Sequence, residues 1–84
     1  MAQAYVIIHC ETGMEDWVIR NLKKIEGVRE VSGVLSLYDI VVKVKAKDQY
    51  ILEKIITKQI RKVGHIHTTM TLMVIEERKN KNTD

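Results

Sequence analysis

Four stretches of the chain carry the hydrophobic pattern of β-strands. The first, AYVIIHC, is rich in β-branched and aromatic side chains. The clearest alternation lies in the third, where Ile40, Val42, Val44 and Ala46 occupy every second position and therefore share one face. The pattern predicts strands over residues 4–10, 28–35, 38–46 and 67–76.

Two other stretches repeat their apolar residues every three or four positions, as amphipathic helices do. Thr12 followed by Glu15 has the spacing of a capping box, and it predicts a first helix over residues 13–25. Asp48 is the predicted N-cap of a second helix that runs through Val63 and is closed by Gly64.

The predicted order is strand, helix, strand, strand, helix, strand, which is typical of the ferredoxin-like (split βαβ) fold in the α+β class. Right-handed crossovers place both helices on one face of a four-stranded antiparallel sheet. We expect the helices to cover Val6, Ile8, Ile40, Val42, Val44, Leu72 and Val74.

The opposite sheet face is predicted to be unusually apolar for a surface in contact with water. Burying even ~500 Å² of such surface contributes on the order of 12 kcal/mol before the cost of association. We therefore predict a dimer packed through the open sheet faces, with an interface formed by Tyr5, Ile7, Val41, Met73 and Ile75.

Length and composition limit the remaining choices. With 84 residues the chain can form one small domain, here expected over residues 1–77, and such a domain buries only about 60% of its unfolded surface. A single cysteine, Cys10, permits no internal disulfide and agrees with a reducing cytoplasm. We expect a cytoplasmic protein with no membrane contact, because neither a signal-peptide pattern nor a long apolar run is present.

The net charge of +3 owes much to the basic segment 78–84. We expect this segment to be a flexible tail. The alternative is an arm that binds nucleic acid.

The predicted topology brings several polar residues to one end of the sheet. Asp39 at the start of the third strand can accept a hydrogen bond from an ammonium group, and the hydroxyls of Thr69 and Thr71 face the same way. Backbone groups of the 34–37 loop can bind a carboxylate. Such a set suits a zwitterion such as an amino acid. The alternative is that Asp39 caps a hairpin turn and the threonines are ordinary strand residues.

A metal site or a catalytic site has weaker support. His9, His65, His67 and Cys10 lack the spacing of known metal-binding motifs, so we predict no metal and expect Cys10 to pack in the core. The chain also lacks a visible nucleophile–base pair, carboxylate dyad or glycine-rich phosphate loop. We therefore expect neither an enzyme nor a bound cofactor.

Three segments carry a family resemblance: AYVIIHCETGMEDWVIRNLKKIEGVREV, LYDIVVKVKAKD and HTTMTLMVIEE. They resemble the effector-binding (RAM) domain of Lrp/AsnC transcription regulators, in the stand-alone form without DNA-binding helices, over residues 4–77. The resemblance implies dimers that close into octamer-like rings, and small effectors, usually amino acids, bound in clefts where dimers meet. It implies that the cleft is lined by Val34, Leu35, Ser36, Leu37, Tyr38, Asp39, Thr69 and Thr71.

One position departs from the family pattern. Family members carry Gly-x-Tyr-Asp, whereas this chain has Ser36-Leu37-Tyr38-Asp39. Glycine permits positive φ and a close approach of a ligand to the backbone, and Ser36 adds a side chain at that point.

The resulting hypothesis is an amino-acid-sensing regulatory domain. It would modulate transcription through its own assembly or by co-assembly with full-length regulators of the family. The alternatives are a protein that binds DNA directly through its basic surface and tail, and a small enzyme or metal protein on the same fold.

Overall fold

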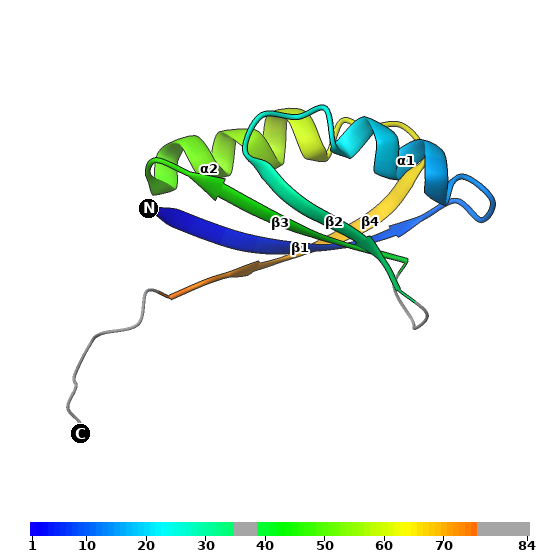
Figure 1. Ribbon diagram of the computed structural model, residues 1–84, viewed down its shortest axis with the longest axis horizontal. Helices are drawn as coiled ribbons and strands as arrows, with labels where there is room; N and C mark the ends of the chain where they lie inside the picture. Colours follow the sequence, from blue (N-terminus) through cyan, green and yellow to red (C-terminus); the bar gives the residue numbers. More distant parts are fainter. Residues whose placement is uncertain (35–38, 76–84) are drawn as a thin grey trace, which may run out of the picture.

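The computed structural model describes residues 1–34 and 39–75. Over these residues the chain forms one antiparallel sheet with strand order β2-β3-β1-β4, and the helices lie along one of its faces (Figure 1). This arrangement confirms the predicted ferredoxin-like α+β fold. In chain order the elements are β1 (Ala2–Cys10), α1 (Glu15–Leu22), β2 (Val28–Gly33), β3 (Ile40–Ala46), α2 (Gln49–Ile55), η1 (Ile56–Ile60) and β4 (Ile66–Met73).

The core lies between the two central strands and the helices. Alternate residues of β1 and β3 point to the helix side, and all of them except the half-buried Ala2 are buried, because apolar residues fill one parity of each strand. As expected, Cys10 belongs to this core and is 2% exposed. The helices contribute Val18, Leu22, Leu52, Ile55, Ile56 and Ile60.

The first helix begins later than its capping box predicted. Gly13 adopts a left-handed conformation with φ +90°, and Met14 takes the N-cap position without a side-chain hydrogen bond. Glu15 does reach back, but its Oε1 accepts from the Gly13 amide at 3.0 Å. The prediction that Thr12 caps this helix is wrong, because the glycine turn moves the helix start beyond it.

The second helix begins as predicted, since Asp48 Oδ1 accepts from the Ile51 amide at 2.9 Å. Beyond α2 the helix continues as the π-helical segment η1, where the Arg61 amide donates to the Ile56 carbonyl, five residues back, at 3.0 Å. The left-handed residue that follows is His65 (φ 68°) and not the predicted Gly64. Gly64 allows a close approach instead, because a Cβ there would lie 3.4 Å from Trp17 Cη2.

The facing of β4 is the main error of the sequence-based prediction. In the β1–β4 register Tyr5 pairs with Leu72, Ile7 with Met70 and Ala4 with Met73. Paired residues share a sheet face, so Leu72 lies on the open side and Met73 on the helix side, the reverse of the prediction. Val74, also predicted to be covered by the helices, lies 39% exposed beside Gln3, and Ile75 follows β4 at 89% exposed.

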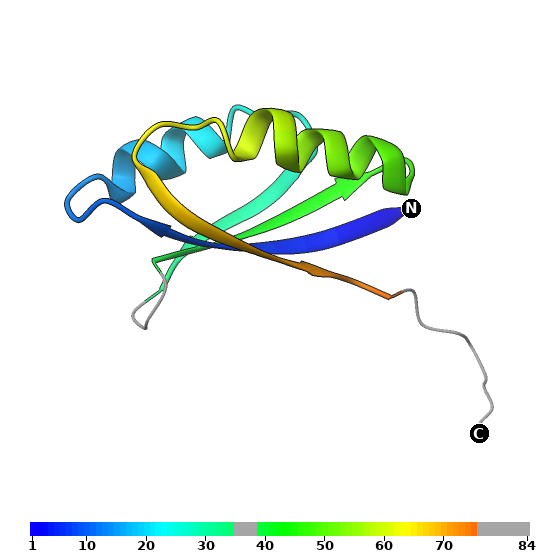
Figure 2. The same cartoon turned by 180° about the vertical axis from the view of Figure 1, so that it is seen from behind.

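The physical reason is that alternation identifies which residues share a face but not which face the helices cover. Met70 and Leu72 do share a face, and the register with β1 places it on the open side, whereas a shift by one residue would exchange the two faces. The helices do not resolve the ambiguity locally, because α2 packs on β1 and β3. As a result β4, the edge strand in front in Figure 2, has no buried residue.

Candidate functional site

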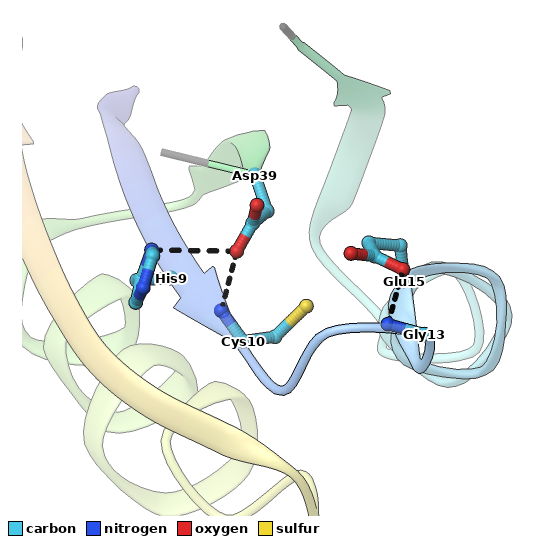
Figure 3. A network of polar contacts seen from close by, with 5 residues as sticks. All are labelled: His9, Cys10, Gly13, Glu15 and Asp39. Carbon is cyan, nitrogen blue, oxygen red and sulfur yellow. Dashed lines mark hydrogen bonds and ion pairs between the residues drawn. The ribbon is translucent and has the colours of Figure 1, made fainter. Parts of the chain in front are cut away.

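Asp39, at the start of β3, connects the ends of two neighbouring strands. Its carboxylate Oδ2 accepts from the Cys10 amide at 2.9 Å and lies 3.4 Å from His9 Nδ1 (Figure 3). Its own amide donates to the Ile8 carbonyl at 3.0 Å, and its carbonyl accepts from the Val34 amide at 2.9 Å. One carboxylate oxygen is therefore engaged within the subunit, where it satisfies a backbone donor at the end of β1.

This carboxylate also acts on the neighbouring thiol. Burial, together with the negative charge of Asp39, raises the pKa of Cys10 above its ordinary value. A raised pKa keeps the thiol protonated at neutral pH, and the protonated form is neither a nucleophile nor a metal ligand. Cys10 therefore contributes its backbone amide to this site and its side chain to the core.

The histidines divide between two places. The His9 and His67 rings lie 6.1 Å apart at 41°, at the Asp39 end of the open sheet face. His65 instead contacts Glu11 Oε1 at 2.9 Å and packs edge-on against Trp17 at 4.9 Å. Within residues 1–34 and 39–75 no three His, Cys, Asp or Glu side chains are grouped so that they could hold a metal.

Thr69 and Thr71 lie on the helix side of β4. They face the second helix across a shallow hollow of about 300 Å³, which we call the β4 trough. Its lining residues are Glu53, Ile56, Thr57, Arg61, Thr69, Thr71 and Met73. Asp39 is not among them, because β1 lies between β3 and β4.

The predicted site residues are therefore not gathered at a single place in one subunit. Val34 and Asp39 lie together at the β2–β3 end, whereas Thr69 and Thr71 line the β4 trough. The predictions for Leu35, Ser36, Leu37 and Tyr38 fall outside the described residues, as does the predicted tail at 78–84.

The model of the Lrp/AsnC ligand binding domain matches residues 3–84. The chain belongs to this family. The resemblance inferred from the sequence is thus confirmed over nearly the whole chain.

Similar proteins include longer chains as well as chains of this size. The homocitrate synthase of Sulfurisphaera tokodaii is 37% identical over 76 residues, which are 89% of this chain but only 16% of that enzyme. The crystal structure of FFRP-DM1 has 32% identity and a TM-score of 0.84, covering 89% of this chain and 100% of that one.

A third likeness shows the fold alone. The Neisseria meningitidis transcriptional regulator NMB0573, solved as a complex with L-Met, is 13% identical with a TM-score of 0.76. The match covers 96% of this chain and 54% of that regulator.

The open sheet face of this Lrp/AsnC domain carries a continuous apolar surface, which we call the open-face patch. Ile7 lies between Val41 and Met70, and Tyr5 lies next to Leu72. Met70 and Leu72 are 46% and 47% exposed. The patch consists of Tyr5, Ile7, Val41, Met70, Leu72 and Val74.

Sequence analysis missed three residues of the β4 trough: Glu53, Thr57 and Arg61. They recur at every fourth position on the second helix, where the prediction used only the apolar positions. Residues spaced by four share a side of a helix, so the local pattern already groups them. The pattern does not indicate that this side lies opposite β4, which the packing of the helix on the sheet decides.

Within the part of the chain that the structure describes, no helix is long and apolar enough to cross a lipid bilayer.

Proposed function

We propose that this Lrp/AsnC domain is a non-enzymatic regulatory domain that binds an amino acid between subunits and thereby changes its assembly. The single observation that carries the proposal is that β4, an edge strand, has no buried residue in the isolated subunit. One face completes the open-face patch and the other lines the trough. An edge strand with so much exposed surface is suited to contacts with neighbouring copies.

The first contact is a dimer through the open-face patches. The patch retains Tyr5, Ile7 and Val41 from the sequence-based interface and replaces Met73 and Ile75 by Met70, Leu72 and Val74. These residues come from three adjacent strands, so two copies can cover them with one flat contact. Hydrophobic burial supplies the driving force.

The effector cleft forms between two subunits, because residues that are separated within one subunit can meet across the contact. Asp39 belongs to a strand separated by β1 from Thr69 and Thr71 and does not line their trough, so we infer that different subunits supply the two parts of the cleft. The solved complex of a fold neighbour with L-Met supports an amino acid as the effector class. Ligand binding across subunits stabilises the assembled state by mass action.

The output is control of transcription by association with longer regulators of the family. This chain matches 54% of the NMB0573 transcriptional regulator, so a domain of the same fold occurs there within a larger chain. Mixed assembly through the same patch would bring an effector-dependent subunit into such a complex.

A second candidate function is control of an enzyme. The similarity to 16% of the homocitrate synthase of S. tokodaii favours it, because that enzyme contains a segment like this chain. The two candidates differ in the protein that co-purifies with a tagged copy of this chain: a DNA-binding regulator in the first case, an enzyme in the second.

The test is assembly state with and without each of the twenty amino acids, measured by sedimentation velocity together with titration calorimetry. We expect one or a few amino acids to bind and to shift the sedimentation coefficient. Flat calorimetric traces for all of them, at every assembly state sampled, would contradict the proposal.

Asp39→Asn is the informative variant, because an amide oxygen can still accept from the Cys10 amide. It removes the charge that an ammonium group would meet and replaces one acceptor oxygen by an NH2 donor. We expect effector binding to weaken by about 1.5–3 kcal/mol, as for a lost charged hydrogen bond, with unfolding little changed. Asp16→Asn, an exposed change on α1, is the matched control, and equal binding by both variants would exclude Asp39 from the site.

A further inference from the structure

The β4 trough has opposite charges at its two ends. Gln49 Nε2 donates to Met73 Sδ at 3.5 Å, so the start of α2 lies beside the end of β4. Arg61 and Thr69 also line a neighbouring hollow at the start of β4. The second helix and β4 therefore run in opposite directions, with Arg61 near Thr69 and Glu53 near Met73.

The spacing by four along the second helix brings these residues to one side, because residues i and i+4 are neighbours on a helix surface. At the end of the helix the Arg61 amide donates to the Ile56 carbonyl, five residues back, which widens the last turn. The Thr57 hydroxyl donates to the Glu53 carbonyl at 2.8 Å and keeps the backbone satisfied at this point. Glu53, Thr57 and Arg61 thus line the same trough.

Both charged residues are available to a ligand. Glu53 and Arg61 are exposed and make no ion pair within residues 1–34 and 39–75. Guanidinium groups bind carboxylates through paired hydrogen bonds, and carboxylates accept from ammonium groups. A cationic end, hydroxyls along the middle and an anionic end are complementary to a zwitterion.

The length of the trough limits which zwitterion fits. Eight residues of helix separate Glu53 from Arg61, about 12 Å between their Cα atoms at 1.5 Å per residue. An ammonium group on the same carbon as the carboxylate stays near Arg61. A cationic group at the end of an extended side chain reaches toward Glu53.

We propose that the β4 trough binds a basic amino acid, with its carboxylate at Arg61 and Thr69 and its side-chain cation at Glu53. This inference rests on the proposed function and names the ligand class for the same site. The Arg61 end of the trough lies at the same end of the sheet as Asp39, the residue proposed above to meet an ammonium group from a second subunit. Thr57 and Thr71 lie along the aliphatic part of the ligand.

Three probes separate the contributions. L-lysine carries both charges, L-norleucine has the same carbon chain without the side-chain amine, and cadaverine lacks the carboxylate. Titration calorimetry on the full 84-residue chain should show L-lysine binding at least about tenfold more tightly than either analogue, since each analogue loses one charged hydrogen-bonding group.

Two variants assign the ends of the trough. Glu53→Gln should weaken L-lysine binding about tenfold and leave L-norleucine unchanged, whereas Arg61→Gln should weaken both amino acids about tenfold and leave cadaverine unchanged. Asp16→Asn and Arg20→Gln are charge-matched controls on the exposed surface of α1. They should bind all three probes as the parent does.

The possible failures are distinguishable. If L-norleucine binds as tightly as L-lysine, or Glu53→Gln has no effect, the ligand class is wrong while the effector function stands. If no amino acid binds at all, the proposed function fails together with this inference. If Glu53→Gln alters the assembly state without ligand, the trough is a contact between subunits and the ligand site is overturned.

Discussion

β3 and β4 flank the same central strand, yet their surroundings differ. Four of the seven β3 residues are buried beneath the helices, whereas β4 has none. The apolar residues of β3 lie mainly on its buried side, whereas Met70 and Leu72 of β4 lie on the open side of the sheet. Apolar content alone therefore does not identify core: in β3 it stabilises the subunit, and in β4 we infer that it serves contacts beyond the subunit.

The largest test of this difference places a charge on each strand. Val42 in β3 is fully buried, so Val42→Asp buries an unpaired carboxylate at a cost of at least about 4 kcal/mol. We expect this variant to lose cooperative unfolding, as measured by circular dichroism during urea titration. A native-like unfolding transition for Val42→Asp would contradict the assignment of this position to the core.

The corresponding charge on β4 should act on assembly instead. Leu72→Asp places a carboxylate in the open-face patch of each copy, which we expect to weaken the dimer by about 2–4 kcal/mol, or roughly 30-fold to 1,000-fold in dissociation constant. The subunit should remain folded by circular dichroism, and sedimentation equilibrium gives the dissociation constant.

Ile75→Asp is the matched control for that experiment. Ile75 belongs to the interface expected from sequence alternation but lies outside the open-face patch. It should leave the dimer unchanged. A stronger effect for Ile75→Asp than for Leu72→Asp would reverse the assignment of the interface.

The smallest expected effects come from exchanging valine and threonine, which have similar shapes, in the two strands. Val42→Thr buries a hydroxyl and should destabilise the subunit by about 1–3 kcal/mol. Thr71→Val changes an exposed position of β4 and should alter the free energy of unfolding by no more than about 0.5 kcal/mol. Urea unfolding at equal protein concentration measures both changes. Equal losses of unfolding free energy would contradict the inferred difference between β3 and β4.

Much of the fold followed from local rules. The strand–helix order, the buried parity of β1 and β3 and the Asp48 cap were all predicted, because each depends on residues close in sequence. The Thr12 cap failed because Gly13 permits a turn that the capping-box pattern does not consider. The start of a helix is a competition among neighbouring residues, and spacing alone does not decide it.

Only part of the candidate site could be predicted from the sequence. Asp39 and the threonines were recognised, but their separation by β1 depends on strand order. Glu53 and Arg61 were not recognised, because only the packing of the second helix on the sheet places them opposite β4.

The sequence by itself determined the fold class and the covered faces of β1 and β3. One parity of each of these strands is apolar, and that local pattern is enough to identify the buried side. Only the tertiary structure decided the facing of β4. Alternation shows that Met70 and Leu72 share a face, but only the hydrogen-bond register with β1 decides which side of the sheet that face takes. That register directs Met70 and Leu72 to the open face and Thr69 and Thr71 to the trough.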